Sequence, residues 1–315
     1  MSYMPTLNKL QIGVEAVLMD EGVDTIEPVG ITNVRITPKV EAIQIPDKRG
    51  DTMPAWLSMV TKRWSEGTIE GYLDYERFQT FLDTMFNADA TSPHAYKADL
   101  DWSGAAEKSL SLRYGQTGLL NLVGGVLPTE LIVTGESGGL LQYTYNFFGG
   151  DVSDGATFAA LTVDTPDFAQ ALTTIYIDEG LGATIGTTAL ADTAFKFSWK
   201  VSANRAPVWH LGELVYDSYK RGKWTGQLDL TLEGTAVALG HFGDQLDATA
   251  TPKSYCVRLR TTDAANTLDL DFVGTVIGVA NVATDLDGVV TIEMSLAPQY
   301  GTVYASCFGA TLTIA

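Results

Sequence analysis

Apolar and polar residues alternate along much of the chain. The clearest run is TGQLDLTLE at 225–233, in which leucine occupies every second position. A period of two is typical of a β-strand with one buried side and one solvent-facing side. The same period recurs in the segments 67–74, 109–114, 141–147, 268–272 and 290–296. The pattern therefore predicts a mainly antiparallel β-protein whose strands each have an apolar and a polar face.

One segment breaks this period. Residues 74–86 read DYERFQTFLDTMF, and their aromatic and aliphatic residues recur every three to four positions. This spacing predicts an amphipathic helix. Asp74 is a suitable N-cap, because its carboxylate can accept hydrogen bonds from the first turn. A glycine-rich counterpart at 233–246 predicts a shorter or irregular second helix.

Several short patterns occur twice in the same order, and all but the last recur after a nearly constant number of residues. They are an acidic pair followed by glycine (20–22 and 178–180), a basic residue before tryptophan (63–64 and 223–224), SLSLRY against TLDLDF (109–114 and 267–272), and GGLLQYTYNFF against DGVVTIEMSLA (138–148 and 287–297). Ordered recurrence indicates a duplication. We interpret the chain as two tandem antiparallel β-sandwich or barrel domains, 1–155 and 156–315, each with one helix.

A long connection interrupts the first domain. The segment 42–63, AIQIPDKRGDTMPAWLSMVTKR, is charged in its middle and contains two prolines. It is longer than the closure of two strands requires. We expect an extended loop or hairpin arm that contacts a neighbouring molecule.

The charge of the chain narrows its possible partners. The 315 residues include 20 Lys and Arg against 38 Asp and Glu, for a net charge of −18. A groove that holds phosphates needs clustered cations, so tight nucleic-acid binding is disfavoured. The most apolar stretch, 118–128, is too short and glycine-rich to span a bilayer. No charged-then-apolar leader opens the sequence, so we expect a soluble protein made in a cytosol.

No arrangement of residues predicts catalysis. The histidines at 94, 210 and 241 are scattered, and the cysteines at 256 and 307 read as buried thiols. TDLDG at 284–288 lacks the ligand spacing of a calcium loop and is better read as a hairpin turn. No carboxylate pair stands out as an acid and base. We therefore expect no enzyme activity, no cofactor and no metal.

The second half resembles a known family. The residues that carry the resemblance are the run FKFSWKVSAN at 195–204, the strand KWTGQLDLTLEG at 223–234 and the closing strand DGVVTIEMSLAPQY at 287–300. ITNVRITPK at 31–39 and GTIEGYLDYERFQTFLDTMF at 67–86 are the corresponding pieces of the first half. The pattern is similar to the major tail tube proteins of long, flexible-tailed bacteriophages (siphophages), in the group whose tube domain is duplicated.

This resemblance implies a structural virion protein. Duplicated members would form homotrimeric, pseudo-hexameric rings that stack into a tube, through which viral DNA passes without specific binding. The implied protein partners are further copies of the chain, the tape measure protein and the tail terminator and baseplate proteins, with no membrane. Such a subunit is assembled in the host cytoplasm and resides in the virion tail.

Two sets of residues are candidates for these roles. Carboxylates on the polar strand faces would line the bore, because they repel phosphates: Glu70, Asp74, Asp229, Glu233, Asp269, Asp271 and Glu293. The middle of the long connection would contact the next ring through Asp47, Lys48, Arg49, Asp51, Met53 and Trp56.

Two other classes of protein fit parts of the pattern. Another tube component of a virion or secretion system would share the fold, although such components usually have one domain. A carbohydrate-binding or hydrolytic β-sandwich would be a monomer that binds saccharides through tryptophan-lined faces. Negative-stain electron microscopy for rings or tubes distinguishes these alternatives from a tail tube.

Overall fold

The computed structural model describes fifteen segments of the chain, to which all structural statements below refer. They are residues 9–15, 17–20, 23–45, 57–88, 93–98, 108–116, 119–154, 157–161, 166–170, 172–190, 194–235, 253–263, 266–279, 285–286 and 289–314. The fold is mainly β and antiparallel, as the alternating pattern predicts.

Each half of the chain, 1–155 and 156–315, is built mainly of strands. The first half contains β1 (Lys9–Glu15), β2 (Val23–Ile26), β3 (Ile31–Ile45), β4 (Leu57–Tyr72), α1 (Tyr75–Met85), β5 (Asn87–Ala88), β6 (His94–Lys97), β7 (Ser109–Gln116), β8 (Leu119–Glu136), β9 (Gln142–Gly149) and β10 (Val152–Asp154). The second half contains β11 (Thr173–Glu179), β12 (Ala189–Leu190), β13 (Ala194–Ser202), β14 (Ala206–Val208), β15 (Ser218–Lys220), β16 (Thr225–Glu233), β17 (Ser254–Asp263), β18 (Asn266–Val279), β19 (Asp285–Leu286), β20 (Val289–Pro298) and β21 (Phe308–Thr313).

Both halves pair their strands in the same order. The first half runs β2–β1–β7–β8–β9–β4–β3 across its hydrogen-bonded neighbours. The second half runs β12–β11–β17–β18–β20–β16–β13. A further strand, β10 or β21, lies on the long central strand of each half.

The register also agrees between the two halves. Val34 lies opposite Ile69 and Ile43 opposite Met59 in the β3–β4 hairpin. In the second half, Trp199 lies opposite Leu228, and Val208 lies opposite Ser218. In both halves the two pairs are nine residues apart on the first strand and ten on the second. The β14–β15 ribbon is therefore the positional counterpart of the outer part of the β3–β4 hairpin.

The strand pairing also tests the repeated sequence patterns. Residues 63–64 lie within β4, and residues 223–224 directly precede its counterpart β16. The segments 138–148 and 287–297 include the counterpart strands β9 and β20. SLSLRY lies on β7, whereas TLDLDF lies on β18, which is the counterpart of β8. That match is wrong, because alternation looks alike in any half-buried strand and does not identify its neighbours.

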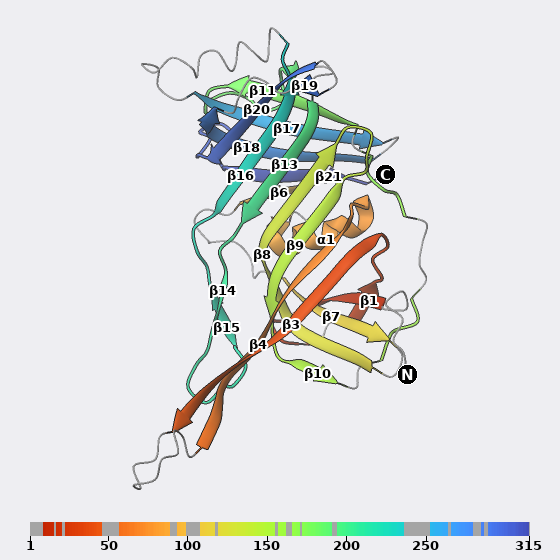
Figure 1. The fold of residues 1–315 in the computed structure, drawn as a ribbon, viewed down its shortest axis with the longest axis vertical. Coiled ribbons are helices and arrows are strands. Elements are labelled where there is room, and N and C mark those ends of the chain that lie inside the picture. Colours follow the sequence, from red (N-terminus) through yellow and green to blue (C-terminus); the bar gives the residue numbers. More distant parts are fainter. Residues whose placement is uncertain are drawn as a thin grey trace.

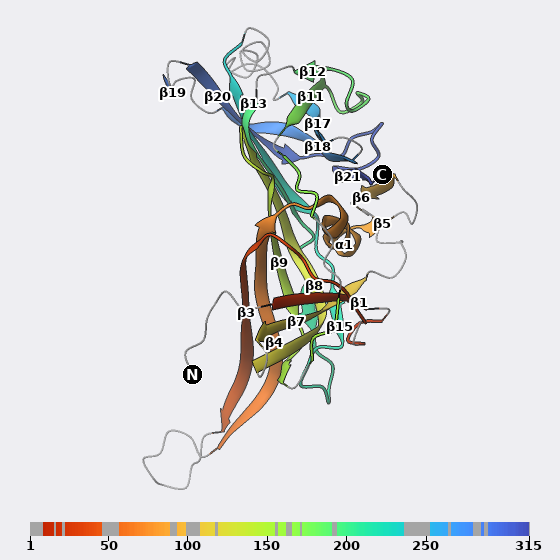
Figure 2. The ribbon, with the colours of Figure 1, turned by 90° about the vertical axis from the view of Figure 1, so that its right-hand side faces the viewer.

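The two halves share one continuous sheet. Residues 130–136 of β8 pair with 196–202 of β13. This seam joins eight strands in the order β3–β4–β9–β8–β13–β16–β20–β18. Figure 1 shows these strands crossing the length of the molecule, and Figure 2 shows the sheet from its edge.

The predicted helix at 74–86 is confirmed and covers one face of this sheet near the seam. Asp74 caps it, accepting hydrogen bonds from the backbone N–H groups of Glu76 (3.1 Å) and Arg77 (3.3 Å). On its buried side, the Phe81 ring lies 4.7 Å from that of Tyr145. The predicted second helix, 233–246, falls largely outside the described residues.

Arg205 connects the second half to the end of this helix. Its buried guanidinium donates hydrogen bonds to the carbonyl oxygens of Thr84 (3.0 Å), Met85 (3.0 Å) and Pro128 (3.2 Å). The last carbonyls of a helix have no partners within the helix and carry partial negative charge, so a cation is favourable there. The helix is thus fixed by residues from both halves.

Candidate functional site

The eight-stranded sheet has one apolar and one polar face. The apolar face contains Leu131, Val133, Tyr145, Trp199 and Leu228, all of them buried. On the opposite face, no described helix or strand covers the sheet (Figure 2). This open polar face, called the polar sheet face below, is a candidate functional surface.

Four of the predicted bore residues lie on the polar sheet face. Glu70 is on β4, Asp229 and Glu233 are on β16, and Glu293 is on β20. Asp229 lies opposite Ser295, and Thr231 lies opposite Glu293, so the carboxylates follow neighbouring strands. Glu293 is exposed and the other three are partly exposed. The structure thus brings together, on one surface, side chains from both halves of the chain.

Hydrogen bonds join side chains on neighbouring strands of this face, and an ion pair crosses the seam. Asn33 donates to Glu70 (3.1 Å), and Asn146 donates to Glu130 (3.0 Å). Glu130 also forms an ion pair with Lys200 across the β8–β13 seam, with 2.8 Å between Nζ and Oε1. These contacts hold the side chains in place without a covering layer.

Further charged residues share the face and escaped the sequence interpretation. They are the acidic Glu66, Glu130 and Glu136 and the basic Arg35, Lys39, Lys196 and Lys200. The three glutamates lie in strands that alternate weakly, and β8 is interrupted by glycines and a proline. Their position relative to Glu70 follows from the strand register and has no local sequence signal. Carboxylates outnumber cations on the face when the two sets are combined.

The prediction that Asp74, Asp269 and Asp271 are exposed to solvent is wrong. Asp74 is buried as the helix N-cap. Asp269 and Asp271 lie on the part of β18 that is covered on both faces and are 5% and 1% exposed. Each faces an arginine on β17, Arg260 or Arg258. These three carboxylates are structural, and they offer no charge to a passing polyanion.

The predicted inter-ring residues, Asp47, Lys48, Arg49, Asp51, Met53 and Trp56, lie outside the described residues. The strands on either side of them are described, however, and form a two-stranded ribbon. Figures 1 and 2 show β3 and β4 extending beyond the body of the molecule. The expected loop or hairpin arm at 42–63 is therefore a hairpin arm in its described part.

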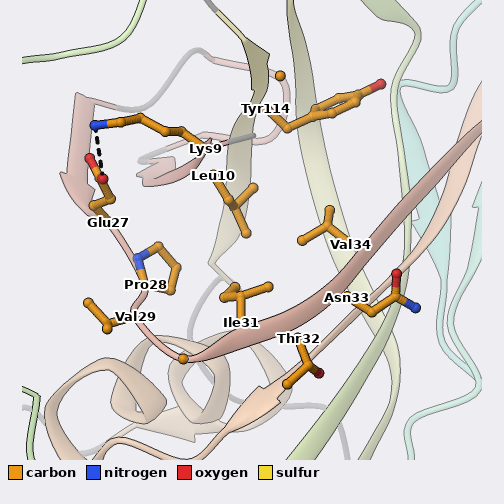
Figure 3. Close-up of a pocket in the computed structure, with 12 residues that line it drawn as sticks. Lys9, Leu10, Glu27, Pro28, Val29, Ile31, Thr32, Asn33, Val34 and Tyr114 are labelled. Carbon is orange, nitrogen blue, oxygen red and sulfur yellow. Dashed lines mark ion pairs between the residues drawn. The ribbon is translucent and has the colours of Figure 1, made fainter. Parts of the chain in front are cut away.

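A groove of about 540 Å³ opens beside the start of β3 (Figure 3). It is lined by Leu10, the segment 27–34 and Tyr114, and at its edge Lys9 forms an ion pair with Glu27 (3.2 Å). Figure 3 shows Thr32, Asn33 and Val34 along one side of the groove. Among the described strands, β3 pairs with β4 alone, so its other edge has no strand partner. The groove therefore gives access to an unpaired strand edge.

The described residues offer few signs of other functions. Among them, no three or more His, Cys, Asp and Glu side chains gather as they would around a metal ion. Within the same part of the chain, no helix has the length and apolarity needed to cross a membrane. No model of a protein family matches the sequence, and no curated protein is significantly similar to it.

Proposed function

We propose that this chain is the major tail tube subunit of a siphophage-type virion, a tandem duplication whose two halves occupy equivalent places in a ring. Three copies would form a pseudo-hexameric ring, and stacked rings would form a conduit for viral DNA. The shared strand order and hairpin register of the two halves support the duplication. The acidic excess on the polar sheet face supports its placement toward the bore.

The β8–β13 seam is the observation that carries this proposal. Within one chain, β13 of the second half pairs with the end of β8 of the first half. The counterparts of these two edges are the outer edge of β3 and the end of β18, at 276–279. The outer edge of β3 has no partner in the register of the described strands. On β18, Val276 still donates its backbone N–H to the carbonyl oxygen of Lys253 (3.1 Å), and the edge opposite β20 is unpaired among the described residues from Ile277, which is 64% exposed. Two copies can therefore repeat the internal seam between them.

Repeating this seam generates a closed assembly. An unpaired edge offers backbone N–H and C=O groups to another chain. A head-to-tail contact between different surfaces forms a ring if the rotation closes. If successive halves are related by the same rotation about the ring axis, the seam between two chains repeats the rotation that the internal seam makes between the two halves of one chain. The proposed trimer is the case in which six such rotations complete the circle.

The internal seam also predicts the register between chains. Lys200 lies opposite Ile132 at the seam. Their counterparts, found through the neighbouring strands, are Arg35 and Gly278. We expect Arg35 of one copy to lie opposite Gly278 of the next. Paired strand residues have Cα atoms about 4.5–5.5 Å apart, which suits a disulfide.

The test is an Arg35→Cys, Gly278→Cys double variant under mild oxidation. We expect covalent oligomers up to a closed trimer on non-reducing gels, and rings or tubes by negative-stain electron microscopy. The native thiols of Cys256 and Cys307 should form few disulfides under these conditions, because both are buried and burial raises the pKa of each to about 11. Each single variant serves as a control.

A monodisperse monomer without crosslinks would refute the proposal. Binding of that monomer to a glycan column would favour a carbohydrate-binding protein instead. If the largest crosslinked oligomer contains a number of chains other than three, the proposed ring would stand but its stoichiometry would differ from a trimer. The tape measure, terminator and baseplate contacts remain part of the same proposal and depend on its ring.

A further inference from the structure

The second-half arm (203–224, including β14 and β15) packs against one end of the first half. Tyr216 is buried there, with its ring 5.3 Å from that of Phe148. The backbone N–H of Arg63 donates to the carbonyl oxygen of Leu214 (2.7 Å), and the rings of Trp64 and Trp209 lie 5.5 Å apart. Leu127, Leu18 and Met19 complete this apolar contact. A docked arm is thus already present within one chain.

The first-half arm (38–45 and 57–64) has the same register as the second-half arm. Its base, at Lys62, Arg63 and Trp64, contacts the second-half arm, but among the described residues its outer part, 40–45 and 57–60, has no equivalent of the contact that buries Tyr216. Ile43 and Met59 occupy the places of Val208 and Ser218. Val40, Ile43 and Met59 are each more than half exposed. Figures 1 and 2 show this ribbon projecting away from the body. Exposed apolar side chains on a projecting ribbon are typical of a contact surface.

The surface that corresponds to the docked end of the first half lies on the second half. Phe148 lies opposite Leu127 at the end of β9. The corresponding positions at the end of β20 are Gln299 and Val273, which are joined by a backbone hydrogen bond of 2.9 Å. The turn that follows, 299–305, leaves Tyr300 and Val303 at least half exposed. We call this surface the second-half rim.

We propose that the first-half arm of one copy docks on the second-half rim of a neighbouring copy in the same ring. This inference rests on the proposed function, since it needs β3 of one copy beside β18 of the next. The arm continues directly from β3, and Val273 lies four residues before Ile277, where the unpaired edge of β18 begins among the described residues. Within one chain, β13 pairs with β8 of the first half, and the second-half arm, which follows β13, packs on the end of that same half. If β3 pairs with β18 of a neighbouring copy, the first-half arm, which follows β3, reaches the second-half rim of that copy in the same way.

The apolar residues on the two surfaces fit one another in character. Ile43 and Met59 would cover Tyr300 and Val303, as the second-half arm covers Phe148 and Leu127. Burial of exposed apolar area favours the contact. The occupant of the rim is therefore a second copy of this chain, and the base of the arm acts within a ring.

The experiment is chemical crosslinking of a Met59→Cys, Val303→Cys variant with a short, flexible bismaleimide. Both positions are exposed, so we expect an unchanged circular dichroism spectrum. Assembled protein should give crosslinked dimers and trimers in a yield at least tenfold above a Met59→Cys, Leu172→Cys control. Leu172 is equally exposed but lies at the opposite end of β11 from the rim.

The seam variant separates this inference from the proposed function. If Arg35→Cys, Gly278→Cys forms the covalent ring while the arm and rim do not crosslink above the control, the first-half arm docks elsewhere and this inference is wrong. If neither variant forms crosslinks between chains and no ring forms, both the proposed function and this inference are wrong. Crosslinking at both pairs supports both.

Discussion

Arg258 holds the carboxylate of Asp271 with two parallel hydrogen bonds, from Nε to Oδ1 at 2.7 Å and from Nη2 to Oδ2 at 2.8 Å. Arg260 holds Asp269 in the same manner, with both distances 2.7 Å. In each pair the arginine of β17 lies opposite the aspartate of β18, and the two pairs are neighbours along these strands, so Arg258 also approaches Asp269 at 3.3 Å. Such bidentate pairs satisfy the planar donors and acceptors of both groups. The paired arginines therefore offset part of the cost of burying these two side chains.

We predict that Asp271→Ala lowers the free energy of unfolding by about 3–5 kcal/mol, because it leaves the Arg258 guanidinium without its buried partner. Urea denaturation at neutral pH measures this loss. Glu293→Ala is the matched control, since it removes an exposed carboxylate from a neighbouring strand and should change the same quantity by less than about 0.5 kcal/mol. Equal effects of the two substitutions would contradict the structural role of Asp271.

These aspartates also show where the sequence stops being informative. The alternation at 225–233 correctly placed Leu228, Leu230 and Leu232 in the core. The same alternation at 268–272 assigned Asp269 and Asp271 to solvent. The error arises because a polar residue at every second position shows only that these side chains point to the same face of the strand. Whether that face is exposed to solvent depends on residues from distant segments that cover it. In this fold the arginines of β17 and Tyr304 of the second-half rim supply the cover.

The helix could be predicted from the sequence, whereas the full composition of the polar sheet face could not. The helix depends on local spacing and on a cap at its first residue, so 74–86 could be read directly. The polar sheet face depends on which strands become neighbours. Glu70 and Glu293 lie far apart in the sequence, and only the pairing of β4, β9, β8, β13, β16 and β20 brings them to one surface.

Asp178 gives a prediction about pH. Its Oδ2 accepts hydrogen bonds from the backbone N–H groups of Gly186 (2.7 Å) and Thr187 (3.1 Å), and its Oδ1 accepts one from that of Thr188 (2.9 Å). The Thr187 hydroxyl also donates to Oδ1. Burial raises the pKa of this carboxyl, but the hydrogen bonds from Thr187, Thr188 and Gly186 outweigh burial and hold the pKa below its ordinary value.

A carboxyl whose pKa is lower in the folded state stabilises the fold above its unfolded-state pKa, which is about 3.9. This stabilisation is lost as the pH falls through the lower, folded-state pKa. At pH 7, Asp178→Asn should lower the free energy of unfolding by about 1–3 kcal/mol. The asparagine NH₂ group replaces one accepting carboxylate oxygen, so that a donor faces backbone N–H groups that are themselves donors. The difference from the parent protein should narrow below about pH 4. Urea denaturation across pH measures it, with exposed Asp154→Asn as the control. A difference that does not vary with pH would contradict this assignment.

The polar sheet face gives the most direct test of a bore. Replacing Glu70 and Glu293 with lysine would turn two repelling carboxylates into phosphate contacts. Each phosphate contact steepens the fall of log affinity with log salt concentration by about 0.9. If the face lines a closed tube, short duplex DNA should bind inside assembled Glu70→Lys, Glu293→Lys tubes and be protected from a nuclease that is too large to enter.

The control places the same charge change away from this face, at Asp154→Lys and Asp217→Lys, which are both exposed positions. DNA attracted to those lysines should be digested at the rate of free DNA, because it would lie outside the tube. The parent protein should retain little DNA in either place, since its carboxylates remain. Equal digestion on both lysine variants would show that the polar sheet face is an outer surface. Protection confined to the Glu70 and Glu293 variant would place this face inside, where unmodified carboxylates leave the DNA free to move.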